Sequence, residues 1–131
     1  MVNPLKYSKI LIVDDSPFFR SVIKKMLIDA DIGSVYFEAK DGKEAISQYV
    51  SHKPSLVMMD IVMPNVDGVM ATRAIMKYDP NAKIIVISKR ENKETVNEAI
   101  KSGARDYLLK PFDSGQVIMS VSKQLVVNRT W

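Results

Sequence analysis

The chain has 131 residues, of which 47% are hydrophobic and 26% charged, and 19 Lys and Arg against 15 Asp and Glu leave a net charge of +4. This composition is typical of one soluble globular domain, which we expect to span residues 1–131, and it excludes disordered, collagen-like and disulfide-scaffold proteins. Because the chain has no Cys, thiolate catalysis and Cys-ligated metal clusters are excluded as well.

The sequence alternates short apolar runs with amphipathic segments five times. Residues 9–13 form a mostly β-branched apolar run, which predicts a buried strand, and a helix-opening cluster follows at 14–17. From residue 17 to residue 33 the apolar residues recur at spacings of three and four, which is the period of a helix with one buried face. The same alternation predicts strands at 35–38, 55–59, 83–87 and 106–109, and helices at 42–50, 69–78, 94–101 and 116–127.

Strands that are apolar throughout indicate a sheet that is covered on both faces, and the intervening helices are the crossovers that parallel strands require. We therefore predict an α/β fold, a five-stranded doubly wound parallel sheet with helices on both faces and a core within residues 9–127. Such sheets bind ligands at the carboxyl ends of their strands.

The strand ends carry polar residues. The first predicted strand leads into Asp14 and Asp15, the third into Asp60, the fourth into Ser88 and the fifth into Lys110. Carboxylates brought close together repel one another unless a cation lies among them, and hard oxygen ligands of this kind suit Mg²⁺. Lys110 can balance the acidic site or bind an anion beside the metal, and Ser88 can donate one hydrogen bond to that anion.

Each of these residues also has a purely structural interpretation. The segment 14–17 can be a helix N-cap with Pro17 at the first helical position, which is compatible with metal binding. Ser88 can simply end a strand, and Lys110 before a proline can belong to a turn. Asp60 is harder to explain in this way, because an acid in an apolar strand is costly to bury unpaired. Their predicted meeting at one sheet edge favours a functional site.

Four stretches resemble the receiver domain of response regulators in two-component signalling: ILIVDDS at 10–16, MDIVMPNVDG at 59–68, IIVIS at 84–88 and GARDYLLKPF at 103–112. The segment 15–20 (DSPFFR) is also similar to the start of CheY-type and CheB-type receivers of chemotaxis. The resemblance runs from about residue 9 to residue 127. It implies a flavodoxin-like sheet with strand order 2-1-3-4-5 in a CheY-like stand-alone receiver.

By this resemblance, Asp60 is the phosphoacceptor and takes a phosphoryl group from a kinase phosphohistidine or a small acyl phosphate. Asp15 and Asp60 are implied to ligate Mg²⁺ together with the backbone carbonyl of Val62, and Asp14 to act directly or through water. The resemblance further implies that Lys110 pairs with one phosphoryl oxygen.

The resemblance also implies a switch. Ser88 donates a hydrogen bond to the phosphoryl group, which draws the following loop inward and lets Tyr107 turn from exposed to buried. Ordinary packing of an aromatic residue in an edge strand is the alternative for Tyr107. The family's proline at the position of Pro111 follows a cis bond, so we expect a cis Lys110–Pro111 peptide.

Two residues differ from what the family usually has beside the site. Val62 is apolar, and Lys89 is long and cationic where a small residue is usual. We expect Lys89 to change the lifetime of the phosphorylated form. The fourth predicted helix and the segment before it are basic, beside Tyr107, because they carry Lys89, Arg90, Lys93 and Lys101. An acidic or amphipathic partner peptide fits this face. The alternative is a helix face that is simply solvated.

The resemblance implies a response regulator in which a sensor histidine kinase phosphorylates Asp60 and so switches a partner-binding surface on the fourth helix, fifth strand and fifth helix, with chemotaxis as a candidate pathway. Such a protein catalyses only its own aspartyl phosphorylation and dephosphorylation and is not otherwise an enzyme. We expect it to be a monomer or a weak phosphorylation-dependent dimer. The alternative is a pseudo-receiver, a phosphorylation-independent interaction module. Lys89 favours it, and the complete set of Asp14, Asp15, Asp60, Ser88 and Lys110 opposes it.

Other classes of protein fit less well. A haloacid-dehalogenase-like phosphatase carries an Asp-x-Asp motif after its strand, but here Val62 stands where the second Asp of that motif would be. The pair Asp14-Asp15 would repel a nucleotide phosphate, and a transcription factor needs a recognition helix beyond the fifth helix, so we expect no direct nucleic acid binding. Since no apolar run approaches the roughly 20 residues that cross a bilayer, we expect a cytoplasmic protein without membrane contact. His52 lies in a polar stretch, residues 51–54, so we expect it in an exposed loop.

Overall fold

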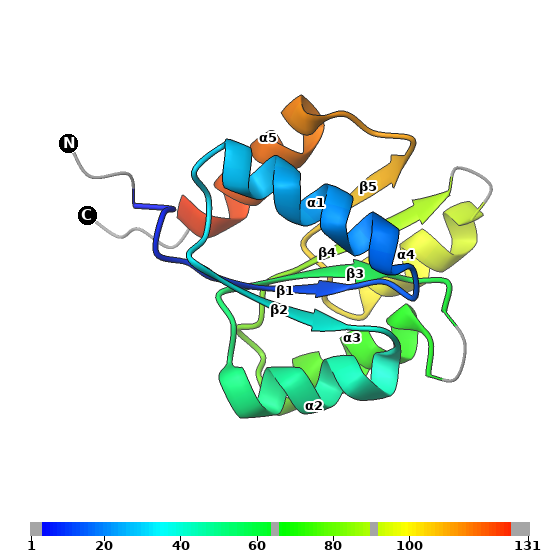
Figure 1. Ribbon diagram of the computed structural model, residues 1–131. Helices are drawn as coiled ribbons and strands as arrows, with labels where there is room; N and C mark the ends of the chain where they lie inside the picture. Colours follow the sequence, from blue (N-terminus) through cyan, green and yellow to red (C-terminus); the bar gives the residue numbers. More distant parts are fainter. Residues whose placement is uncertain (1–3, 64–65, 90–91, 127–131) are drawn as a thin grey trace.

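The structure, a computed structural model, describes residues 4–63, 66–89 and 92–126. In them, strands and helices alternate from end to end as the sequence predicts (Figure 1). The elements are β1 (Lys9–Val13), α1 (Pro17–Asp29), β2 (Val35–Ala39), α2 (Gly42–His52), β3 (Leu56–Asp60), α3 (Gly68–Tyr78), β4 (Ile84–Lys89), α4 (Lys93–Lys101), β5 (Asp106–Lys110) and α5 (Ser114–Val126).

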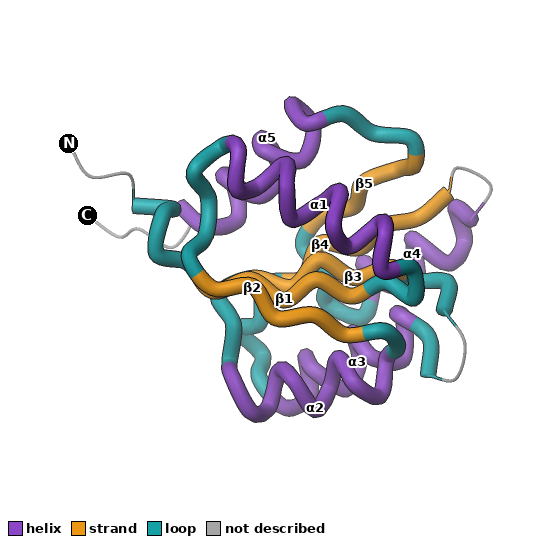
Figure 2. The backbone as a smooth tube through the Cα atoms, viewed as in Figure 1, coloured by secondary structure: helices purple, strands orange, loops and turns teal. Residues whose placement is uncertain are grey.

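The five strands form one parallel sheet in the order β2-β1-β3-β4-β5, which confirms the predicted topology. Figure 2 shows the sheet as a middle layer with α1 and α5 on one face and α2, α3 and α4 on the other. Because all strands are parallel, their carboxyl ends meet at one edge. The helices that follow them start from that edge.

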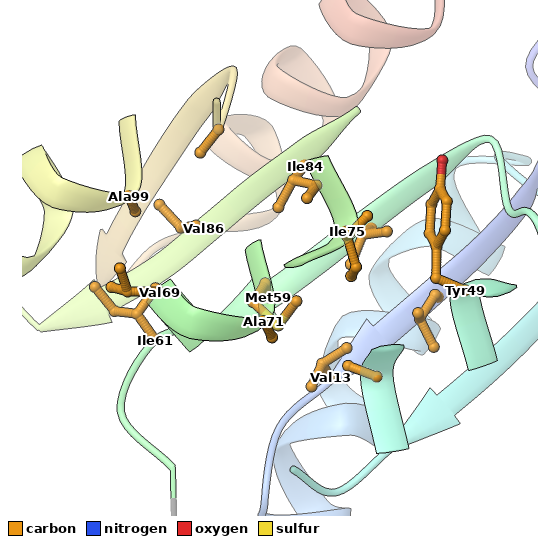
Figure 3. Packing of buried hydrophobic residues seen from close by; sticks show 14 of the residues in the cluster. Val13, Tyr49, Met59, Ile61, Val69, Ala71, Ile75, Ile84, Val86 and Ala99 are labelled. Atoms are coloured by element: carbon orange, nitrogen blue, oxygen red, sulfur yellow. The ribbon is translucent and has the colours of Figure 1, made fainter. Parts of the chain in front are cut away.

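Two apolar clusters hold the helices on the sheet. On one face, Met59 and Val86 of the sheet pack with Ile75 of α3 and Ala99 of α4 (Figure 3). On the other face, α1 and α5 cover a second set of fully or nearly fully buried residues: Ile10, Ile12, Ile23, Leu27, Met58, Ile85, Ile87, Val117 and Val121. Every inner strand is therefore apolar on both sides, which is why the strands read as continuous apolar runs.

The element boundaries differ from the prediction in a few places. β4 continues two residues past 87 to Lys89, and β5 includes Lys110, because these two residues pair in register at the sheet edge. α1 ends at Asp29 rather than near Gly33, since Asp31 and Gly33 have φ values of 58° and 85°, which a right-handed helix does not allow.

His52 is exposed as expected but does not lie in a loop. It is the last residue of α2, where Lys53 ends the helix in the left-handed conformation, and its ring stacks on Phe37 with centroids 4.0 Å apart. The predicted final helix residue, Val127, lies outside the described residues. Among the residues that are described, no helix has the length and apolar character needed to span a membrane.

Candidate functional site

Asp14, Asp15 and Asp60 come together at the carboxyl edge of the sheet, as predicted. Asp14 and Asp15 directly follow β1, Asp60 ends β3, and one carboxylate oxygen from each lies within 4.8 Å of the others. Asp14 and Asp60 are only 1% and 5% exposed, whereas Asp15 is exposed. Two buried carboxylates beside a third form a strongly negative site that attracts a cation.

Several contacts fix Asp14. Its Oδ1 accepts a hydrogen bond from the Ser16 N–H at 2.9 Å, and its own N–H donates to the Ala39 carbonyl at 3.1 Å. The Arg20 guanidinium donates to the Asp14 carbonyl and, at 2.8 Å, to Glu38 of β2. Burial raises the pKa of Asp14, although the Ser16 hydrogen bond and Lys110 oppose this. Arg20 thus ties the end of β1 to β2 directly behind the carboxylates.

Asp60 lies in a similar buried setting. Burial raises its pKa to about 6, the Asp14 and Asp15 charges add to the rise, and the hydrogen bond from the Val62 N–H to Oδ1 and the Lys110 charge oppose it. That hydrogen bond is 3.1 Å long and leaves Oδ2 facing the Lys110 side of the site. One oxygen is thus engaged by the backbone, and the other is available for chemistry.

Lys110 lies between the two buried carboxylates. Its Nζ is 3.6 Å from Asp14 Oδ2 and 3.8 Å from Asp60 Oδ2. The same ammonium lies 4.2 Å from the centroid of the Phe19 ring. The Lys110–Pro111 peptide is cis, which confirms the prediction. A cation on β5 therefore reaches the carboxylates of β1 and β3.

The donor set fits Mg²⁺. Asp14 Oδ2 is buried and has no hydrogen-bond partner among the described residues, although Lys110 lies near it. The three carboxylates open into a cavity of about 310 Å³ lined by Asp14, Asp15, Ser16, Phe19, Asp60, Val62, Lys89 and Lys110. Hard oxygen ligands with room for water molecules are what Mg²⁺ prefers. Asp14, Asp15 and Asp60 would hold the ion.

Close backbone packing supports the end of β3. A Cβ atom on Gly68, the first residue of α3, would lie 2.3 Å from the Asp60 carbonyl oxygen and 2.4 Å from Ile61 Cα. Only glycine allows α3 to begin this close to the strand. At β1, Ser16 caps α1 by accepting a hydrogen bond from the Phe19 N–H, with Pro17 at the start of the helix. The cap interpretation of 14–17 is therefore correct, and it coexists with the acidic cluster.

Ser88 does not reach into the cavity in this structure. It is 1% exposed, and its hydroxyl donates to the Lys89 carbonyl at 3.1 Å. Lys89 is exposed and lines the cavity instead. Tyr107 is 48% exposed and borders a separate cavity of about 220 Å³ with Lys93, Val96, Asn97, Ile100 and Leu109. The predicted coupling of Ser88 to Tyr107 stays a prediction, and Arg90 lies outside the described residues.

Sequence reasoning missed the roles of Phe19 and Arg20. The apolar spacing over residues 17–33 predicted only a buried face for Phe19, which does pack against the cluster under α1 and α5, and it gave Arg20 no role. The available signal is their spacing: Phe19 and Arg20 lie three and four residues after Ser16, which places them on the side of the helix nearest the site.

Comparisons with known proteins agree with this geometry. A model of the response regulator receiver domain matches residues 10–122. The chemotaxis protein CheY of Thermotoga maritima is 44% identical over 115 residues, which are 88% of this chain and 95% of that protein. CheY of Bacillus subtilis is 40% identical over 117 residues, covering 89% of this chain and 97% of that protein.

Solved structures are similar as well. The response regulator domain of Thermotoga maritima CheB has a TM-score of 0.79 at 34% identity, with 92% of this chain and 95% of that one covered. A CheX–CheY–BeF3–Mg²⁺ complex from Borrelia burgdorferi has a TM-score of 0.84 at 31% identity, with 93% and 90% covered.

Proposed function

Since this chain belongs to the response regulator receiver domain family, and is thereby a response regulator of two-component signalling, we propose that a sensor histidine kinase phosphorylates it on Asp60. The observation that carries this proposal is the buried Asp60 carboxylate, whose Oδ2 faces Lys110 at the floor of an open cavity. An Asp60 oxygen attacks the phosphorus of the kinase phosphohistidine. The N–P bond of the phosphohistidine breaks as the new O–P bond forms, and the kinase histidine leaves. We further propose that residues 1–131 form one receiver domain.

Asp14, Asp15 and Asp60 are the proposed metal ligands, together with the backbone carbonyl of Val62. Mg²⁺, when bound, offsets the negative charge on the phosphoryl oxygens. Lys110 pairs with one phosphoryl oxygen in this scheme. In support, its ammonium lies within 4 Å of both buried carboxylates and so beside the acceptor. The protein catalyses its own phosphorylation and dephosphorylation in this scheme and acts on no other substrate.

Ser88 and Tyr107 are the proposed switch. The Ser88 hydroxyl leaves the Lys89 carbonyl and donates to a phosphoryl oxygen, which pulls the end of β4 toward the site. Tyr107, half exposed on the neighbouring strand, then turns inward. In support of this scheme, Ser88 pairs in register with Leu109, two residues from Tyr107 and on the same strand.

The proposed output surface is the face of α4, β5 and α5. The cavity beside Tyr107 has apolar walls from Val96, Ile100 and Leu109, and Lys93 lies at its border. An acidic or amphipathic peptide of a downstream protein fits this combination. We propose that the protein acts as a monomer or a weak phosphorylation-dependent dimer, with no direct nucleic acid binding.

Chemotaxis is the proposed pathway. The support is that relatives at 40% to 44% identity, covered over nearly their whole length, are chemotaxis proteins. One similar structure is a CheY bound to CheX, so a chemotaxis protein of that kind is a candidate partner. We propose a cytoplasmic location, which agrees with the lack of Cys in the sequence.

A pseudo-receiver is the second candidate, because the exposed Lys89 adds a long cationic side chain to the lining of the cavity. A thermal melt with Mg²⁺, with and without beryllofluoride, separates the two functions when native protein is compared with Asp60→Ala. A ligand that binds only the folded state raises the melting temperature. A rise that requires Mg²⁺, beryllofluoride and Asp60 together supports phosphorylation. A cooperative melt without that rise would favour the pseudo-receiver.

A further inference from the structure

β4 and β5 bring a second cation to the acidic cavity. Lys89 and Lys110 are register partners at the carboxyl ends of these neighbouring strands, and both line the cavity. Side chains alternate between the faces of a strand, so Lys89 follows Ile87 onto the face that α1 and α5 cover. Lys110 follows Leu108, of the same cluster, onto that face. The two ammonium groups therefore belong to one side of the sheet.

Asp60 lies on that same side. It follows Met58 of the α1 and α5 face by two residues, and it pairs in register with Ile87, so Lys89 lies two residues further along the adjacent strand. Ser88 points by the same alternation toward the opposite face, and its hydroxyl is bonded to the Lys89 carbonyl. Of the two residues that end β4, Lys89 is thus the one that borders the acceptor.

Lys89 makes the metal-loaded cavity positively charged instead of neutral. The cavity lining contains three carboxylates and two ammonium groups. Adding the two positive charges of Mg²⁺ makes the sum +1, whereas without Lys89 the sum would be zero. Lys89 is exposed and forms no ion pair with the residues that the structure describes, so it acts on the cavity through this long-range field.

We infer that Lys89 is a specificity-determining residue that makes the cavity prefer small dianionic phosphodonors, such as acyl phosphates, over monoanionic ones. The inference rests on the proposed phosphorylation of Asp60. In the step it favours, an Asp60 oxygen attacks the phosphorus of the acyl phosphate. The bond from phosphorus to the acyl oxygen breaks, and the donor leaves as a carboxylate, so the total charge is unchanged. The same ammonium group repels Mg²⁺ from the empty site.

The two effects have opposite signs, which a merely structural role would not produce. Removing Lys89 weakens the selection of a dianion but strengthens metal binding. Coulomb energies at the distances and dielectric of a surface cavity correspond to changes of about threefold to fivefold at low salt. Both effects shrink at high salt, because exposed charges are screened.

The test compares native protein with Lys89→Ala. Its matched control is Lys77→Ala, which removes an exposed lysine in the last turn of α3, a helix that ends at the opposite edge of the sheet. Mg²⁺ binding is measured by calorimetry. Phosphorylation rates are measured with acetyl phosphate, a dianion at neutral pH, and with phosphoramidate, which carries one negative charge.

For Lys89→Ala we expect Mg²⁺ to bind about threefold to fivefold more tightly and the ratio of the acetyl phosphate rate to the phosphoramidate rate to fall by a similar factor. Lys77→Ala leaves both quantities unchanged. Native Mg²⁺ affinity and an unchanged donor ratio in Lys89→Ala would overturn the inference while leaving phosphorylation of Asp60 intact. If neither donor modifies the native protein, and Asp60→Asn behaves identically, the proposed function fails and the inference fails with it.

Discussion

The Lys110 ammonium lies over the ring of Phe19, with Nζ 4.2 Å from the ring centroid. The ring is itself held by an edge-to-face contact with Phe112, at a centroid distance of 5.8 Å. A cation over an aromatic face is attracted by the ring's quadrupole. Phe19 therefore helps to hold Lys110 between Asp14 and Asp60, which links the first turn of α1 to the chemistry of β3.

Phe19→Leu is expected to slow phosphorylation of Asp60 by acetyl phosphate severalfold while the protein still folds, because the leucine fills space but does not attract the ammonium. Phe18→Leu is the matched control, since Phe18 is the preceding residue and is 75% exposed. Rates measured at saturating Mg²⁺ check the prediction. Equal rates in the two variants would show that the ring does not position Lys110.

Arg20→Met is expected to destabilise the fold by about 1.5 to 3 kcal/mol, because it removes charge-assisted hydrogen bonds to the Asp14 carbonyl and to Glu38. Mg²⁺ affinity falls as well, since the end of β1 loses its support. Lys25→Met breaks the exposed pair with Asp29 and is expected to cost about 0.5 kcal/mol or less. Urea unfolding and calorimetry measure both quantities, and equal losses in the two variants would contradict the role of Arg20.

The stability of the metal-free protein is expected to rise as the pH falls through about 6 toward 3.8, the ordinary pKa of an aspartate. The folded state holds the Asp60 proton more tightly than the unfolded chain, so protonation favours folding. Burial is the main cause of the raised pKa, and Asp14 shifts in the same direction. Saturating Mg²⁺ reduces the effect, because the cation favours the carboxylate form.

Melting temperatures across this pH range, measured for native protein and Asp60→Asn without divalent metal, check this prediction. The variant has no titrating group at position 60, so its pH dependence is expected to be shallower. Parallel curves for the two proteins would mean that Asp60 has an ordinary pKa in the folded state.

Gly68→Ala is expected to destabilise the protein strongly and to weaken Mg²⁺ binding, because the added Cβ would meet the backbone of Asp60 and Ile61 at 2.3 and 2.4 Å. Gly115→Ala is the control: its Cβ would meet only a side-chain oxygen, Asp113 Oδ1, at 3.3 Å, and no backbone atom. This second change is neutral or stabilising by about 0.5 kcal/mol, since alanine loses less entropy in a helix. Denaturant midpoints that fall equally in both variants would refute the close approach of α3 to β3.

The sequence pattern determined the doubly wound parallel architecture and the membership of the acidic cluster, and the strand order followed from the resemblance to receiver domains. Continuous apolar runs such as residues 56–59 of β3 require cover on both faces, and parallel strands place all their carboxyl ends at one edge. Asp14, Asp15, Asp60 and Lys110 were therefore predictable as neighbours from the place where each strand ends. This information is local along the chain, so one sequence was sufficient.

Only the tertiary structure decided the contacts between elements. Nothing along the chain shows that Phe19 holds Lys110, that Arg20 reaches both Asp14 and Glu38, or that Lys89 rather than the side chain of Ser88 lines the cavity. These contacts depend on the direction of each side chain and on the register between strands. In the structure β4 extends two residues past 87, and this extension places Ser88 on one face of the sheet and Lys89 on the other. Side-chain direction at a strand end is set by pairing with the neighbouring strand, which is a property of the folded chain.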